Sequence, residues 1–130
     1  MLYLDSSALV KLVITEPESR ALTRWLAERA DLALVSSALH RTEVPRAIWK
    51  ADPSGLPRSL RQMRSVQKVR VTTAILDSAS AIPPQSLRSA DAIHLASALS
   101  IRRDLTAFVA YDKRLLAAAR DAGLPTASPA

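Results

Sequence analysis

Short apolar runs that alternate with segments of helical periodicity are the feature that most constrains how this chain folds. The runs cover residues 2–4, 32–35, 69–71 and 107–110, of which only 69–71 contains a charged residue, Arg70. Runs of this length without strict polar alternation are typical of strands buried on both faces of a sheet. Between them, apolar residues such as Leu22, Trp25 and Leu26 recur at helical spacing. The pattern predicts βαβ units and a three-layer α/β/α sandwich with a mostly parallel sheet of four to five strands.

The expected helix boundaries follow from capping residues. Ser6 and Ser7 are expected to cap a helix over 8–13, and Ser36 and Ser37 a helix that runs to about residue 50. Residues 15–18 have the form of a capping box. Further helices are expected through residue 82, over 90–100 and over 112–122, and residues 124–127 add an edge strand.

Composition limits the class of protein. A length of 130 residues and an apolar fraction of 48% predict one domain over residues 1–130 with a packed core. The absence of cysteine excludes disulfides and thiolate metal sites. No apolar run approaches the roughly 20 residues that cross a bilayer, and no basic leader precedes the first run. We therefore expect a cytoplasmic protein without a membrane segment.

The charge balance favours a polyanionic partner. The chain has 18 Lys and Arg against 12 Asp and Glu, a net charge of +6. Most of the basic residues are arginine, whose planar guanidinium suits phosphate. We expect RNA as the partner, although a genome rich in G and C would also enrich arginine.

Acidic residues stand where a parallel sheet places its ligands. Asp5 follows the first apolar run, and Asp112 follows the fourth with one residue between. Both are expected in the crevice at the carboxyl ends of the strands. Asp91 lies near the start of one helix and Glu43 lies within another. Four convergent carboxylates would repel one another unless a hard cation such as Mg²⁺ held them, which predicts metal-assisted hydrolysis.

Each acid also has a structural alternative. Asp5 and Asp112 could simply cap the helices that follow them. Asp91 could complement the helix dipole. Glu43 could pair with Arg46 one helical turn away.

Four segments in order along the chain resemble the conserved blocks of PIN-domain proteins of the VapC type. They are MLYLDSSALVKL at 1–12, RTEV at 41–44, SADAIHLA at 89–96 and YDKRL at 111–115. Their order and spacing agree across essentially the whole chain.

The resemblance implies a magnesium- or manganese-dependent endoribonuclease that is the toxin of a type II toxin–antitoxin pair. It implies a cognate VapB-type antitoxin, RNA as substrate and a homodimer. Asp5 and Asp91 match the acids most directly tied to the metal, with Glu43 and Asp112 completing the catalytic set. Ser7 matches a hydroxyl position beside the first acid.

The sequence departs from the family pattern at two positions. Ala110 stands where relatives often have Thr or Ser, so a hydroxyl contact is absent there. Pro45 lies inside the helix that bears Glu43 and is expected to kink it.

Other polar residues near the motifs have two readings each. His94 lies one turn after Asp91 and could act as a general acid or base, or be structural. Four cations could hold RNA phosphates or be ordinary solvated charges: Lys11, Arg41, Arg46 and Lys50.

Two alternative functions were weighed. A catalytically silent PIN-like module would bind RNA or protein without cutting, but retention of all four acids argues against it. A phosphoacceptor receiver domain would need an aspartate after the third strand, where Val71 is followed by Thr72. The predicted function is therefore the endoribonuclease.

Overall fold

The computed structural model describes residues 1–130, built around a five-stranded sheet in the order β3-β2-β1-β4-β5. Every neighbouring pair is parallel, so the carboxyl ends of the strands lie at one edge. Tyr3 in the central strand pairs with Val35 on one side and Phe108 on the other. The strands are β1 (Leu2–Leu4), β2 (Leu34–Ser37), β3 (Val66–Val69), β4 (Ala107–Val109) and β5 (Thr126–Ala127).

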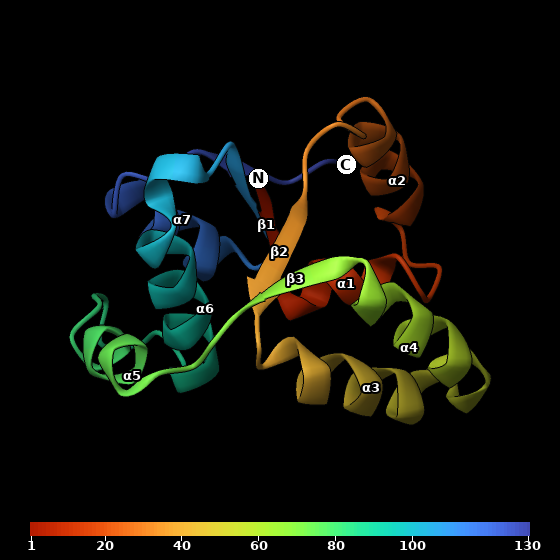
Figure 1. Ribbon diagram of the computed structural model, residues 1–130, viewed down its shortest axis with the longest axis horizontal. Helices are drawn as coiled ribbons and strands as arrows, with labels where there is room; N and C mark the ends of the chain where they lie inside the picture. Colours follow the sequence, from red (N-terminus) through yellow and green to blue (C-terminus); the bar gives the residue numbers. More distant parts are fainter.

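Helices cover both faces of this sheet, which confirms the predicted α/β/α sandwich. In Figure 1, α1 to α4 lie on one side of β1 and β2, and α5 to α7 lie on the other. The helices are α1 (Ser6–Lys11), α2 (Ser19–Ala27), α3 (His40–Ala51), α4 (Leu56–Arg64), α5 (Thr73–Ser80), α6 (Ser89–Ser100) and α7 (Lys113–Asp121), with 3-10 turns at Pro53–Gly55 and Arg102–Asp104.

The alternation of side chains along β1 divides the core into two halves. Leu2 and Leu4 pack with Leu9 and other residues beneath α1 and α3. Tyr3 points to the opposite face and packs in a second cluster that includes Leu95 of α6. Because successive residues of a strand face opposite sides, one tripeptide anchors both helical layers.

Two strand predictions were wrong in their bounds. β3 covers Val66–Val69, not 69–71, so the strand begins three residues earlier than predicted. β3 is an edge strand paired only with β2, and it exposes two polar residues, so it lacks the continuous apolar run of a strand buried on both faces. β2 begins at Leu34, because that residue pairs with Leu2, and it extends into buried Ser36 and Ser37. The predicted helix cap at those serines is therefore wrong.

Two helix starts also differ from the predictions. Asp5, not Ser6 or Ser7, caps α1, because its carboxylate accepts from the backbone N–H of Ala8. The predicted capping box is absent, and α2 starts at Ser19 without a side-chain cap. Glu18 is instead bound by Lys11 at 2.8 Å. The remaining predicted helices and the C-terminal edge strand are confirmed with small shifts.

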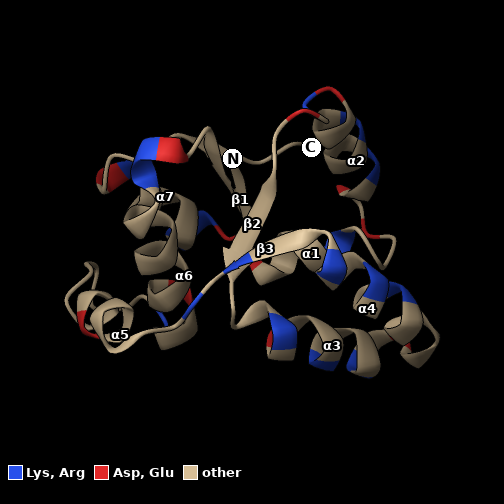
Figure 2. Ribbon diagram, in the orientation of Figure 1, with Lys and Arg blue, Asp and Glu red and all other residues tan.

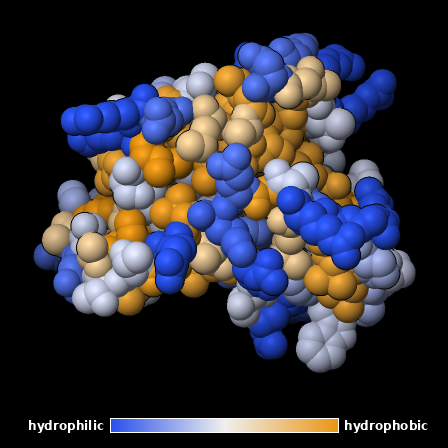
Figure 3. Space-filling model, in the orientation of Figure 1, coloured by the Kyte–Doolittle hydropathy of each residue, from blue (hydrophilic) through white to orange (hydrophobic).

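Basic residues are distributed unevenly over the two helical layers. Figure 2 shows Lys and Arg on α2, α3 and α4, whereas α5 carries none. The face seen in Figure 3 shows hydrophilic side chains over α4 and apolar surface towards the middle of the molecule. No helix is both long and apolar enough to span a membrane.

Candidate active site

Asp5 lies directly after β1 and is held by the first turn of α1. Its side chain accepts hydrogen bonds from the Ala8 N–H at 2.9 Å and from the Ser7 hydroxyl, at 2.8 Å to Oδ1 and 3.0 Å to Oδ2. Only 5% of Asp5 is exposed, and no cation pairs with it. Burial raises the pKa of Asp5, the hydrogen bonds from Ala8 and Ser7 oppose this shift, and the charge of Asp91 adds to it.

Glu43 reaches the same region from α3, which runs without interruption through Pro45. Its Oε1 accepts from the Ser6 hydroxyl at 2.8 Å and lies 2.7 Å from Nε2 of His94. Burial raises the pKa of Glu43, but the hydrogen bond and charge interaction with His94, then the hydrogen bond from Ser6 and the charge of Arg88, outweigh burial and lower the pKa overall. The alternative pairing with Arg46 does not occur.

Asp91 and Asp112 stand at the starts of α6 and α7. Asp91 lies in the first turn of α6, and its Oδ2 accepts from Nε of Arg88 at 3.1 Å. Asp112 caps α7 through Oδ1, which accepts from the Leu115 N–H at 2.9 Å. Asp5 and Asp112 are thus helix caps, which was the structural alternative for both residues. Both also lie at the predicted edge of the sheet.

Three of the acids share one arrangement. In Glu43, Asp91 and Asp112, one carboxylate oxygen is bound by the protein and the other makes no hydrogen bond with it. A carboxylate anchored through one oxygen presents the second to a ligand in a fixed direction.

Charge interactions show that the acids lie near one another. The pKa of Arg88 is raised first by its hydrogen bond and charge contact with Asp91, and then by the charges of Asp112 and Glu43. Asp91 in turn acts on the pKa of Asp5. Arg88 therefore stands among three carboxylates that come from α3, α6 and the start of α7.

The donor set fits a hydrated hard cation. No three His, Cys, Asp or Glu side chains gather closely enough to hold a metal ion directly between them. Mg²⁺ keeps several of its waters and needs only one or two carboxylates directly. The free oxygens of Asp91, Asp112 and Glu43, beside an Asp5 that is buried without a cation, meet that requirement.

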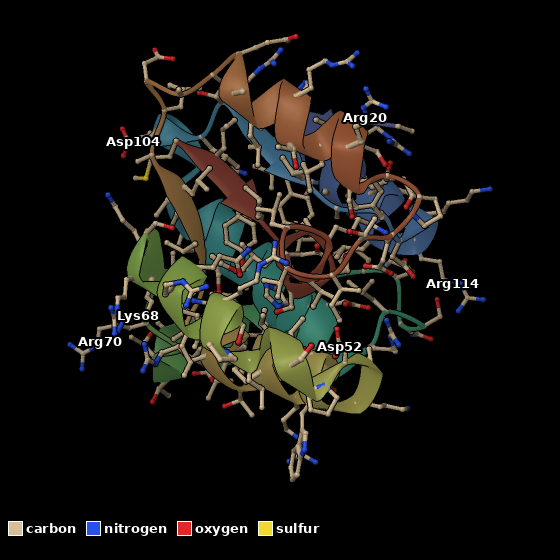
Figure 4. All side chains as sticks on the ribbon, turned by 90° about the vertical axis from the view of Figure 1, so that its right-hand side faces the viewer. Arg20, Asp52, Lys68, Arg70, Asp104 and Arg114 are labelled. Carbon is tan, nitrogen blue, oxygen red and sulfur yellow. The ribbon has the colours of Figure 1, made fainter.

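A basic pocket adjoins Asp112. The pocket has a volume of about 480 Å³ and is lined by Ser86, Arg88, Tyr111, Asp112, Lys113 and Arg114. Arg88 is bound to Asp91 only through Nε, which leaves its two terminal nitrogens free. Figure 4 shows Arg114 at the edge of the molecule opposite Lys68 and Arg70. Three cations in such a pocket suit a phosphodiester.

The four cations considered for phosphate binding lie outside this pocket. Lys11 is engaged by Glu18 and Glu16 and lies 4.7 Å from the Tyr111 ring centroid. Arg41, Arg46 and Lys50 are exposed on α3 and form no ion pair. The pocket cations were missed, although Arg88 lies one turn before Asp91 and Lys113 and Arg114 directly follow Asp112.

The chain matches a known family and several named proteins. The family model of the PIN domain matches residues 2–121. Ribonuclease VapC47 of Mycobacterium tuberculosis (strain CDC 1551 / Oshkosh) is 41% identical over 132 residues, covering 99% of this chain and 97% of the relative. Ribonuclease VapC46 of Mycobacterium tuberculosis (strain ATCC 25618 / H37Rv) is 42% identical over 128 residues, covering 98% and 97%.

Two solved structures share the fold. VapC20 of Mycobacterium tuberculosis, a toxin that cleaves the sarcin-ricin loop, superposes with a TM-score of 0.77 at 14% identity, covering 99% of this chain and 100% of that one. VapBC2 of Rickettsia felis, solved with a DNA fragment from its promoter, gives a TM-score of 0.72 at 10% identity, with complete coverage of both chains. The family match and the close relatives span nearly the whole chain, so this protein belongs to the PIN-domain family and, within it, to the VapC ribonucleases.

Proposed function

We propose that this protein is a magnesium-dependent endoribonuclease, the toxin of a type II toxin–antitoxin pair, with Mn²⁺ as a possible substitute metal. The observation that carries the proposal is the shared arrangement of Glu43, Asp91 and Asp112, each anchored through one oxygen with the other free. The named ribonucleases at 41–42% identity supply RNA as the substrate class.

Each acid has a distinct role in this proposal. Asp5 and Asp91 would hold the cation, and Glu43 and Asp112 would complete its surroundings. A bound divalent cation supplies Lewis-acid chemistry, activating water and neutralising charge that develops on the phosphodiester. Ser7 orients Asp5 by donating to both of its oxygens. The free terminal nitrogens of Arg88, with Lys113 and Arg114, bind RNA phosphates beside Asp112.

The partners follow from the family. The resemblance to VapC toxins implies a cognate antitoxin, and the solved structure of VapBC2 from Rickettsia felis agrees with such a pairing. We therefore propose a VapB-type antitoxin, a homodimer and a cytoplasmic location for this chain. A short antitoxin-like reading frame next to its gene, and the molar mass of the purified protein by light scattering, test the first two.

Substitution of the metal-binding acids tests the activity. We expect Asp5→Asn and Asp91→Asn to lower magnesium-dependent RNA cleavage by more than about 100-fold, since even residues that only orient a metal ligand typically contribute 10–100-fold. Asn keeps the shape of Asp and an oxygen that can cap α1, so the fold is retained. The measurement is cleavage of labelled RNA with and without a chelator.

Asp31→Asn is the matched control, because Asp31 is exposed and precedes β2 at the opposite edge of the sheet. Its cleavage rate should equal that of the unmodified protein. Binding of RNA without metal-dependent cleavage would instead support the catalytically silent module. Equal cleavage by Asp5→Asn and the unmodified protein would remove Asp5 from the site.

A further inference from the structure

A buried hydrogen-bonded chain stands behind Glu43 and has no role in the proposed function so far. It runs from the backbone of Ser37 in β2 through Tyr3 in β1 and His94 in α6 to Glu43 in α3. We propose that His94 is a positioning residue: in its neutral form it donates from Nε2 to Glu43, and Tyr3 and Ser37 fix that tautomer. The inference rests on the proposed function, in which Glu43 serves the metal.

The direction of each hydrogen bond follows from the first donor. A backbone N–H can only donate, so Ser37 donates to the Tyr3 hydroxyl over 2.9 Å. The phenol uses its single proton towards Nδ1 of His94, 2.7 Å away. Nδ1 is then an acceptor, and the proton of a neutral imidazole must lie on Nε2. Nε2 faces Oε1 of Glu43 at 2.7 Å.

The opposite arrangement sets two acceptors against each other. If Nδ1 carried the single hydrogen of the neutral ring, Nε2 would face Oε1 of Glu43 with a lone pair, and a carboxylate oxygen can only accept. The Tyr3 oxygen would also have to accept from both Ser37 and His94. Its own proton would have to turn to the neighbouring hydroxyl of Ser36 or Ser97. Tyr3 is fully buried, and burial raises the pKa of its phenol, which stays protonated.

Packing prevents this chain from rearranging. The Tyr3 ring stacks on Phe108 with centroids 5.2 Å apart and meets the His94 ring edge-on at 6.0 Å. His94 is only 2% exposed. Both of its nitrogens are engaged by protein groups, so it is not placed to exchange a proton with RNA, and the general acid–base role considered from sequence is not supported.

His94 links the helix that carries Asp91 to the helix that carries Glu43. His94 lies one turn after Asp91 on α6, whereas Glu43 comes from α3 on the other side of the sheet. By binding Oε1, His94 and Ser6 leave Oε2 of Glu43 as the oxygen that would face a bound metal. A group that orients a metal-binding carboxylate in this way commonly controls both metal affinity and rate.

Two amide substitutions distinguish a donor from a space-filler. The Nε2 amide of Gln reaches about as far as imidazole Nε2, whereas the Asn amide reaches only as far as Nδ1. We expect His94→Asn to lower cleavage by about 10–100-fold and to weaken Mn²⁺ binding similarly. His94→Gln should recover about tenfold over His94→Asn in both measurements. Mn²⁺ binding is measured by titration calorimetry, and thermal melting verifies that both variants fold.

The tautomer is read directly from the unmodified protein. Long-range ¹H–¹⁵N spectra should show His94 protonated at Nε2 and not at Nδ1. In Tyr3→Phe, which keeps the ring stacked on Phe108, the preference for that tautomer should weaken. A proton on Nδ1 in the unmodified protein overturns the proposal, even if the His94 variants do not fold. Equal cleavage and Mn²⁺ affinity for the Asn and Gln variants overturn it as well.

Glu43→Gln separates this inference from the proposed function. If Glu43→Gln cleaves RNA as fast as the unmodified protein, the assignment of Glu43 to the metal site is wrong, whatever the tautomer of His94. If Glu43→Gln is inactive while His94→Asn retains full activity and Mn²⁺ affinity, the site stands and the positioning role fails.

Discussion

At the scale of single residues, Asp5 is a buried carboxylate that is held by hydrogen bonds but has no cation to balance its charge. Asp5 is buried, accepts hydrogen bonds only from Ser7 and Ala8, and has no cation partner. A buried ionised carboxylate without a counter-ion destabilises the fold. A metal-binding acid must nevertheless stay in place before the metal arrives, so function and stability oppose one another at this position.

This conflict predicts that Asp5→Asn is more stable than the unmodified protein in metal-free buffer at neutral pH. Because burial raises the pKa of Asp5 in the folded state, the folded protein holds this proton more tightly than the unfolded chain. Proton binding by Asp5 therefore contributes to the free energy of unfolding. This contribution is fully present below the pKa of an ordinary carboxyl and is lost as the pH rises through the raised pKa of folded Asp5.

Urea denaturation at several pH values tests this prediction. The advantage of Asp5→Asn should be absent at acidic pH and should grow towards neutral pH. Added Mg²⁺ should stabilise only the protein that retains Asp5, because a ligand stabilises the state that binds it. An Asn variant less stable than the unmodified protein at neutral pH would contradict the burial cost.

At the scale of elements, α7 is capped at both ends, and only one of the two caps is a site residue. Asp112 caps the start of α7, and a Schellman motif closes its end. There the Gly123 N–H donates to the Arg120 carbonyl at 2.9 Å and the Leu124 N–H to the Ala119 carbonyl at 3.0 Å. Gly123 has φ +89°, a conformation that other L-residues rarely adopt.

Gly123→Ala should therefore destabilise the protein by about 1 kcal/mol. A Cβ at this position would have nothing within 4 Å, so the cost is conformational rather than steric. Gly123→Asn should lose less, since Asn tolerates the left-handed region. Urea denaturation measures both variants. Cleavage below the melting transition should be unchanged, and a loss of activity would show that the C-terminal end of α7 positions Asp112.

At the scale of the whole molecule, the net charge of +6 and the pocket beside Asp112 together favour a polyanion. Cations that contact RNA phosphates release counter-ions from the RNA when they bind it. Salt weakens both the attraction of RNA to the overall positive charge and a direct contact between one cation and an RNA phosphate. Only the direct contact is lost when a single side chain is removed. Two exposed arginines at opposite edges of Figure 4, Arg114 and Arg70, allow the two effects to be compared.

We expect RNA binding without metal to weaken as the salt concentration rises. Arg114→Ala should reduce the slope of the logarithm of the binding constant against the logarithm of the salt concentration by about 1. Arg70→Ala removes the same charge on the other side of the molecule and should leave the slope unchanged. Fluorescence anisotropy with a labelled RNA gives both values. Equal slopes for the two variants would mean that the pocket makes no phosphate contact of its own.

Local pattern was sufficient for much of the fold and for part of the site. The runs at Leu2–Leu4 and Ala107–Val109 are buried on both faces, and such strands are apolar whatever their neighbours, so the sheet, Asp5 and Asp112 followed from sequence alone. The four motif blocks identified the family for the same reason, because each is a short contiguous segment.

Only the tertiary structure decided the contacts that give the site its geometry. Tyr3 and His94 are 91 residues apart and His94 and Glu43 are 51 apart, so no local pattern predicts that they meet. The same holds for the sequestered Lys11, for the edge position of β3 and for the gathering of Arg88 with three acids. Helical spacing allowed Arg46 as a partner of Glu43, but in the structure the buried imidazole of His94 in α6 lies 2.7 Å from Oε1 of Glu43. The sequence by itself determined which acids stand at the edge of the sheet, and the strand order, which brings α3 and α6 together, determined how those acids are held.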